Sequence, residues 1–314
     1  MRVYFTFEPR LDLREPLVAE FPAVTFVFEQ SISDDELSQA EILVTYGEDL
    51  DDEKIAIAGK LQWIFVVSAG VEKMPVQAIA DRGIYVSNVR GIHKKPMMET
   101  ILAHILSLKR GLPSIYEQQA RGEWNKNIPL TELNDSTVMI LGPGAIGQEI
   151  GRVLQALDVH TIGINSMGEM ANYMNETYPI AQLLNHLPKA DIVISILPST
   201  PKTKSLLTHK HFEAMKSSAI FMNFGRGDIV DEAVLVQALE ERLIAHAVLD
   251  VYQEEPLPPA SPIWQLKNVT VSPHISSHSS RYVERSLAIF KPSLRNWLNG
   301  ERRLENEMSI LRGY

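Results

Sequence analysis

The sequence predicts an α/β protein with two doubly wound parallel sheets, each covered by helices. Short apolar runs alternate with longer helical segments, as they do where parallel strands are joined by helices. The chain has 314 residues, which is enough for two domains. Hydrophobic residues make up 45% of it, which is enough apolar surface for two cores.

The first series of elements lies in the amino-terminal part of the chain. The runs RVYFTF, EILVTYG and LQWIFVVSAG are typical of buried strands at residues 2–7, 41–47 and 61–70. Between them, helical segments are expected at 34–40 and 48–60. These elements predict the first parallel sheet.

Two long helical segments lie before and after a second series of strand-like runs. Residues 97–124 keep an apolar stripe for about seven turns, which predicts one long helix with a domain boundary just before it, near residue 92. The segment 279–300 is again helical, and Pro292 is expected to interrupt it.

A second series of strands begins at Thr137. Six strand-like runs follow one another with helices or loops between them, and six such strands predict a doubly wound sheet. They lie at 137–142, 159–165, 191–197, 219–225, 245–251 and 268–274.

Composition excludes several classes of protein. The chain has no cysteine, so disulfide scaffolds, thiolate metal sites and a cysteine nucleophile are excluded. Its net charge of −9 argues against a general nucleic-acid surface. No long uncharged apolar run occurs, so we expect a cytoplasmic, unprocessed protein without a membrane partner. No histidine pair has zinc-like helical spacing alongside a glutamate, so no metal is expected.

The stretch GPGAIG follows a predicted strand directly and opens a predicted helix. Backbone N–H groups and the helix dipole at such a turn can face a pyrophosphate. Gly142 allows the sharp turn, Gly144 the close approach of phosphate, and Gly147 the tight contact between helix and sheet. In this context the motif predicts a dinucleotide site, although three glycines alone occur often by chance.

The end of the second strand departs from the usual pattern. An acidic residue commonly holds the adenosine ribose there, but this chain has Asn165 followed by Ser166. Neutral side chains do not repel a 2′-phosphate, so NADP is weakly favoured over NAD. No lysine or arginine follows before Ala171 to pair with that phosphate, and loss of strict selectivity stays open.

Charged and titratable residues follow three later strands. Arg226, Glu255 and His274 are the candidates, with Asp250 at the end of its own strand. The carboxyl ends of parallel strands form the ligand crevice of an open α/β sheet. Together these side chains provide a cation for a carboxylate, a proton donor and a carboxylate to orient that donor, which carbonyl reduction requires.

The sequence resembles the D-isomer-specific 2-hydroxyacid dehydrogenases over nearly its whole length. The motifs that carry the resemblance have the family's order and about its spacings: GPGAIG, LPSTPKTKSLL, NFGRGDIVDEAVLVQAL, LDVYQEEPLP and SPHIS. The resemblance implies that Arg226, Glu255 and His274 are the catalytic residues.

The resemblance also implies the binding residues. The loop VVSAGVE is similar to the family's substrate loop, so the backbone amides of Ala69, Gly70 and Val71, together with Arg226, are expected to bind the substrate. The expected cofactor-binding residues are Gly142, Gly144, Ala145, Ile146, Gly147, Asn165, Ser166, Leu197, Pro198, Thr203, Phe224, Gly225 and Asp250.

The architecture implied by the resemblance is a Rossmann dinucleotide-binding domain inserted into a flavodoxin-like substrate domain. The expected boundaries are 1–92 plus 276–314 for the substrate domain and 93–275 for the NAD(P) domain. The helix from Met97 is expected to supply much of a homodimer interface.

The implied reaction is the reduction of a small 2-oxo acid to the D-2-hydroxy acid by NAD(P)H. The pair Asn165 and Ser166 makes the chain look more like the glyoxylate/hydroxypyruvate reductases than the lactate dehydrogenases of the family. Two alternatives stay open at this point. One is a non-catalytic, corepressor-like protein that senses dinucleotides, and the other is an enzyme similar to phosphoglycerate dehydrogenase.

Overall fold

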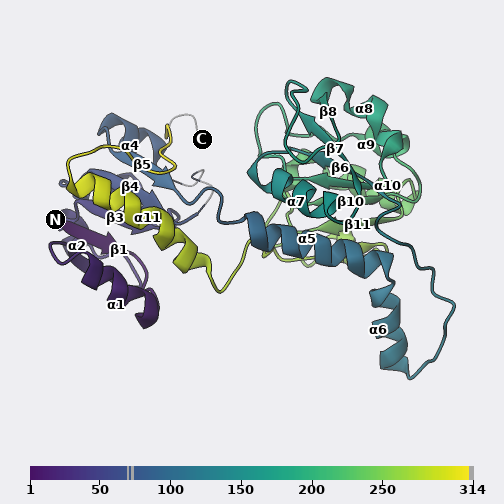
Figure 1. The fold of residues 1–314 in the computed structure, drawn as a ribbon, viewed down its shortest axis with the longest axis horizontal. Coiled ribbons are helices and arrows are strands. Elements are labelled where there is room, and N and C mark those ends of the chain that lie inside the picture. The colour runs from purple at the N-terminus through teal and green to yellow at the C-terminus, as the bar shows by residue number, and fades with distance from the viewer. Residues whose placement is uncertain (69–70, 72–73, 311–314) are drawn as a thin grey trace. The chain divides into compact units, whose positions relative to one another are not determined.

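The computed structural model of the chain describes residues 1–68, 71 and 74–310. It divides into two compact units (Figure 1). Unit 1 comprises Met1–Ile92 and Ser279–Tyr314, and unit 2 comprises His93–His278. Both contain a wholly parallel sheet with helices on its two faces, so the predicted fold class is confirmed.

The sheet of unit 1 has five strands in the order β2-β1-β3-β4-β5, which is the flavodoxin-like order. Its strands are β1 (Arg2–Phe5), β2 (Thr25–Phe28), β3 (Ile42–Thr45), β4 (Trp63–Val66) and β5 (Tyr85–Asn88). The three runs predicted as strands contain β1, β3 and β4. All residues of β3 and β4 are buried, because helices cover both faces of this sheet.

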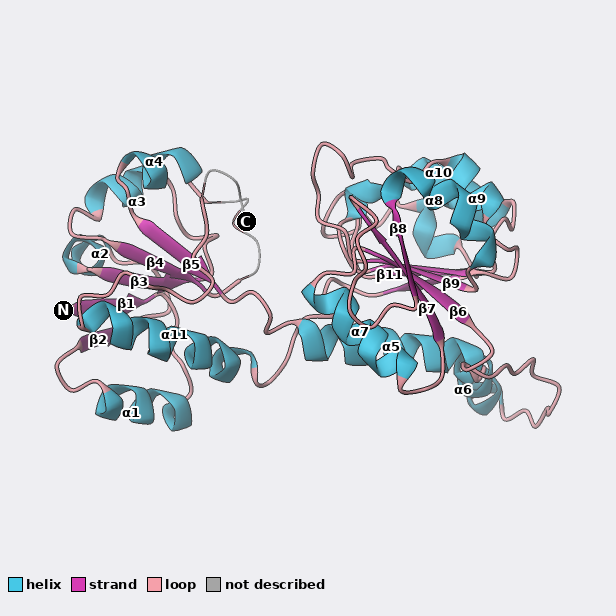
Figure 2. Ribbon diagram, turned by 45° about the horizontal axis from the view of Figure 1, so that its top comes forward, coloured by secondary structure: helices cyan, strands magenta, loops and turns pink. Residues whose placement is uncertain are grey.

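Successive residues of these strands point into two different cores. Phe5 and Trp63 join α1 (Leu11–Glu20) and α11 (Tyr282–Leu298) on one face. Tyr4 and Ile64 belong to the other core. Short helices cover this second face of the sheet (Figure 2). These are α2 (Asp34–Gln39), α3 (Asp52–Ile57) and α4 (Val76–Asp81).

The sheet of unit 2 has seven strands in the order β12-β11-β10-β9-β6-β7-β8. The order from β8 to β11 is that of a Rossmann sheet, and β12 extends it at one edge. The strands are β6 (Thr137–Leu141), β7 (His160–Asn165), β8 (Glu176–Pro179), β9 (Ile192–Ser195), β10 (Ile220–Asn223), β11 (His246–Leu249) and β12 (Val269–Val271).

The helices of unit 2 again cover both faces of the sheet (Figure 2). One core contains α5 (Lys94–Lys109) and α7 (Ala145–Gln155), and the other contains α8 (Leu183–His186), α9 (His209–Ala214) and α10 (Glu232–Glu240). A further helix, α6 (Leu112–Arg121), buries none of its residues. Short 3-10 turns occupy Ile180–Gln182, Leu187–Lys189, Gly227–Ile229 and Pro262–Gln265.

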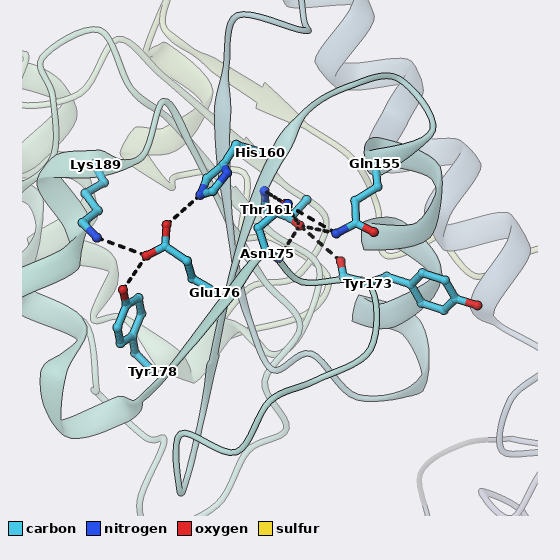
Figure 3. A network of polar contacts seen from close by, with 8 residues as sticks. All are labelled: Gln155, His160, Thr161, Tyr173, Asn175, Glu176, Tyr178 and Lys189. Carbon is cyan, nitrogen blue, oxygen red and sulfur yellow. Dashed lines mark hydrogen bonds and ion pairs between the residues drawn. The ribbon is translucent and has the colours of Figure 1, made fainter.

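The sequence predicts six of the seven strands of this sheet, and the strand that it does not predict is β8. It is an edge strand of four residues, and hydrogen bonds between polar side chains hold it in place (Figure 3). Glu176 accepts a hydrogen bond from Tyr178 Oη, and its carboxylate lies 2.8 Å from His160 Nε2 and 3.2 Å from Lys189 Nζ. Polar residues and a proline concealed this strand, because strands are recognised by apolar runs.

Two helix predictions were wrong in detail. The helix predicted over 97–124 is broken into α5 and α6 at Gly111, whose φ of 62° is left-handed. By contrast, α11 runs through Pro292 without interruption. Its side chains Phe290, Leu294 and Trp297 are buried in unit 1, and that burial outweighs the lost backbone hydrogen bond.

Candidate active site

The GPGAIG turn connects β6 to α7, as predicted. Gly142 has φ 90° and Gly147 packs so tightly that an added Cβ would lie 2.7 Å from the carbonyl oxygen of Gly142. An added Cβ at Gly144 would meet no atom within 4 Å, so the space beside this residue is open. The first N–H groups of α7, from Ala145 to Gly147, have no carbonyl of the preceding helical turn to bind. The turn therefore fits a pyrophosphate.

Asn165 shapes the loop that follows β7. Its Oδ1 accepts hydrogen bonds from the N–H groups of Met167 and Gly168, at 3.1 and 2.6 Å, and its Nδ2 donates to Glu169 O at 2.7 Å. Ser166 is exposed beside it. The structure thus gives the Asn165 side chain a role in loop geometry, which the sequence analysis missed.

Glycines bring neighbouring strand ends into contact. The missing Cβ of Gly142 would lie 3.2 Å from Leu197 Cδ2, and that of Gly225 would lie 2.4 Å from Leu197 O. The loops after β6, β9 and β10 are therefore contiguous. Phe224 is buried beneath them, and Pro198 is exposed. The Thr203 hydroxyl donates to Pro198 O at 2.6 Å and so shapes the loop after β9.

Arg226 stands at the end of a turn that Asn223 organises. The Asn223 side chain is buried, accepts from Gly225 N at 3.2 Å and donates to Arg226 O at 2.9 Å. Asn223 is not among the site residues expected from the sequence, although its place at the end of β10 is a signal. An added Cβ at Gly227 would lie 1.9 Å from the carbonyl carbon of Tyr252, so this turn abuts the loop that carries Glu255.

Glu255 and His274 are brought together by the loops after β11 and β12. His274 Nδ1 lies 2.7 Å from Glu255 Oε2, and Glu255 Oε1 accepts a hydrogen bond from Tyr252 N–H at 3.0 Å. Both side chains are partly exposed, at 46% for His274 and 36% for Glu255, so a small molecule can reach them. The geometry leaves Nε2 as the ring nitrogen that can face a ligand.

Tyr252 lies directly behind this pair. Its buried hydroxyl donates to Leu249 O at 2.7 Å and lies 3.0 Å from Ser272 O. Burial raises the pKa of Tyr252 well above its ordinary value, so the phenol stays protonated and serves as a structural hydrogen-bond donor.

Asp250 is fully buried. Its carboxylate accepts hydrogen bonds from Ser272 Oγ at 2.6 Å, Ile275 N at 3.0 Å and Ser276 N at 3.1 Å. The family resemblance implies that Asp250 is a cofactor contact, and the structure adds these three hydrogen bonds within unit 2.

The expected substrate loop belongs to unit 1. Val71 is buried there, whereas Ala69 and Gly70 lie outside the described residues. Among residues 1–68, 71 and 74–310, no group of three or more His, Asp or Glu side chains gathers as a metal site would. Within the same residues, no helix is long and apolar enough to cross a membrane.

Residues 102–276 match the family model described as the NAD binding domain of D-isomer specific 2-hydroxyacid dehydrogenase. The mouse glyoxylate reductase/hydroxypyruvate reductase is 35% identical over 245 residues, which are 75% of this chain and 74% of that protein. Glyoxylate/hydroxypyruvate reductase B of Yersinia pestis (strain Pestoides F) is 31% identical over 260 residues, 81% of this chain and 80% of that protein.

Solved structures show the same fold. A D-isomer specific 2-hydroxyacid dehydrogenase family protein from Aeromonas salmonicida has a TM-score of 0.89 and 30% identity, covering 98% of this chain and 99% of that one. The chain therefore belongs to the D-isomer-specific 2-hydroxyacid dehydrogenase family and is an NAD(P)-dependent 2-hydroxyacid dehydrogenase.

Proposed function

We propose that the protein reduces a small 2-oxo acid, of the glyoxylate or hydroxypyruvate type, to the corresponding D-2-hydroxy acid. The observation that carries this proposal is the 2.7 Å contact between His274 Nδ1 and Glu255 Oε2. A carboxylate in this position fixes the ring and favours a proton on Nδ1, so that a protonated imidazole presents Nε2–H to a substrate oxygen. The named activities of the mouse and Yersinia relatives support this substrate class.

The proposed roles divide among three side chains. Arg226 binds the substrate carboxylate and stabilises charge that develops during reduction. His274 donates a proton to the former carbonyl oxygen, and Glu255 orients His274. The bound nicotinamide would supply the hydride. We also propose that the backbone of residues 69–71 contributes to carboxylate binding.

The cofactor would be held by unit 2, which also carries Arg226, Glu255 and His274, whereas residues 69–71 belong to unit 1. Gly142, Gly144 and the first turn of α7 would bind the pyrophosphate. Asn165 and the exposed Ser166 carry no negative charge at the end of β7, so these two side chains would not repel a 2′-phosphate. NADPH is therefore the proposed cofactor, and NADH is the alternative that an assay with both cofactors would distinguish.

The test of this function is a substrate panel with a histidine variant. Glyoxylate, hydroxypyruvate, pyruvate and a branched 2-oxo acid are each assayed with NADPH and NADH. We expect activity on the small acids, and we expect His274→Ala to lower kcat by about two to four orders of magnitude because the proton donor is lost. Cofactor affinity, measured by fluorescence titration, should stay nearly unchanged.

The control is His278→Ala, which removes another exposed histidine from the same segment and should leave turnover as it is. Full turnover of His274→Ala would rule out the assigned role. Cofactor binding without turnover of any acid in the panel would favour the sensor alternative.

We further propose that the protein forms a homodimer through α6 and the loop after it. No residue of α6 is buried, and Tyr116 and Trp124 are 62% and 90% exposed. Large apolar side chains exposed together on a projecting element are typical of an interface with another chain.

A further inference from the structure

His274 has an unusual backbone conformation. Its φ is 54°, in the left-handed region that residues with a side chain rarely adopt. It also lies in a loop directly after β12, an edge strand of three residues. Such a conformation persists only where the surrounding structure fixes it. Something other than regular secondary structure must therefore hold the imidazole within reach of Glu255.

The contacts of Asp250 provide that constraint. Oδ1 accepts from Ser272 Oγ and Ile275 N–H, and Oδ2 accepts from Ser276 N–H, so the bonds start on both sides of His274. The carboxylate is 0% exposed. A carboxylate buried this deeply is costly unless it is fully hydrogen-bonded. Other paths of the loop that would remove these hydrogen bonds are therefore disfavoured. The two successive N–H groups directly after the left-handed residue thus bind one carboxylate.

Ser272 is linked to the other half of the pair as well. Its backbone N–H donates to Tyr252 Oη at 3.2 Å, and Tyr252 N–H in turn holds Glu255 Oε1. Ser272 therefore joins the segment that carries His274 to the loop that carries Glu255. It also supplies a side-chain donor to Asp250, whereas the donors of Ile275 and Ser276 are backbone N–H groups that a side-chain substitution other than proline leaves in place.

We propose that Ser272 is a positioning residue, whose hydroxyl group anchors the loop to Asp250 and so holds the His274 imidazole against Glu255. The expected change in kcat rests on the proposed function. The expected change in the contact between His274 and Glu255 does not. Ser272 contacts neither ring nor substrate in this scheme, and it acts through the geometry of His274.

The experiment compares three serine variants. Ser272→Ala removes the hydroxyl, and Ser272→Thr keeps a hydroxyl in the same place. Ser261→Ala is the matched control, because Ser261 is also 8% exposed, lies in unit 2 and donates to a carboxylate, that of Glu232, at 2.8 Å. We expect Ser272→Ala to lower kcat about tenfold or more with cofactor Kd unchanged, the size expected for one lost bond to a charged group. Ser272→Thr should restore most of kcat, and Ser261→Ala should lower only Tm.

A second measurement does not depend on turnover. Imidazole nitrogen NMR, with His274 assigned from His274→Gln, reports the hydrogen-bonded Nδ1 proton of His274. We expect this signal in the wild type and in Ser272→Thr, and its loss or broadening in Ser272→Ala. An unchanged signal or an unchanged kcat in an active Ser272→Ala would overturn the proposal, as would failure of Ser272→Thr to restore both. If the wild type is inactive on every acid but the signal still depends on Ser272, the proposed function fails and the positioning role stands.

Discussion

At the scale of single residues, two glycines of GPGAIG have different surroundings, so their substitution is expected to have different effects. Gly147→Ala places a methyl group 2.7 Å from a backbone oxygen, so we expect a Tm several degrees lower and weaker cofactor binding. Gly144→Ala meets no protein atom within 4 Å, so we expect an unchanged Tm. It should still weaken NADPH binding about tenfold or more, because the methyl group occupies the space proposed for phosphate.

The measurements are thermal unfolding without cofactor and fluorescence titration with NADPH. Equal cofactor affinity of Gly144→Ala and the wild type would contradict the assignment of this turn to the pyrophosphate.

Glu176 provides a pH-dependent contribution to stability. Hydrogen bonds from Tyr178, and then from His160, lower the pKa of Glu176 to about 2. A lowered carboxyl pKa stabilises the folded state above the ordinary value of about 4.3, and this stabilisation is lost as pH falls toward 2. We expect Glu176→Gln to reduce the free energy of unfolding by about 1 kcal/mol at pH 7, allowing for solvent screening.

The difference between wild type and Glu176→Gln should shrink steadily from pH 5 to pH 3 in urea denaturation. Glu240→Gln, at an exposed position on α10, is the control and should show little difference at either pH. A deficit that stays constant over this range would exclude the carboxylate charge as its source.

At the scale of elements, the break between α5 and α6 depends on Gly111. Its φ is 62°, and an added Cβ would lie 2.6 Å from Ile128 Cγ2. Gly122 ends α6 with φ 65° and has no atom within 4 Å of an added Cβ. Both alanine variants should lose about 1 kcal/mol of stability because of the left-handed backbone. Gly111→Ala should lose more, because Ile128 must also move.

The comparison is made by urea unfolding of the two variants. Equal losses would show that Ile128 adapts without cost and that backbone strain alone accounts for the effect.

Elements were predicted well where a local pattern determines them. The runs around β6, β9 and β10 are apolar and almost wholly buried, so the sequence predicts these strands. β8 was missed because polar side chains hold it, and a bend at Gly111 cannot be read from an apolar stripe that continues beyond it. The interruption expected at Pro292 failed because packing of α11 outweighs local propensity.

The same distinction applies to the candidate site. The contact between Glu255 and His274 was expected from the family resemblance and is present in the structure. The roles of Asn223, Tyr252 and Ser272 depend on contacts between loops distant in sequence, which no local pattern reveals. The position of Asn165 predicts a ribose contact, whereas its hydrogen bonds to the following loop depend on the path of the backbone after β7.

At the scale of the whole molecule, the proposed homodimer makes a prediction about Trp124. Replacing this 90% exposed side chain by serine should shift the chain toward monomer at micromolar concentration, since buried aromatic residues dominate interfaces. Sedimentation velocity measures the shift. Trp264→Ser is the control, because Trp264 is 49% exposed and donates to Pro258 O within its own chain. A wild-type chain that sediments as a monomer would contradict the dimer itself.

The division of unit 1 into two separate stretches of sequence has a consequence for biosynthesis. Its core needs Phe290 and Trp297 of α11, whose ring centroids lie 5.3 and 5.5 Å from that of Trp63, far earlier in the chain. A ribosome releases the whole continuous unit 2 before these rings emerge. The domain begun first is therefore completed last, and in the meantime its half-formed sheet exposes one apolar face to chaperones and proteases.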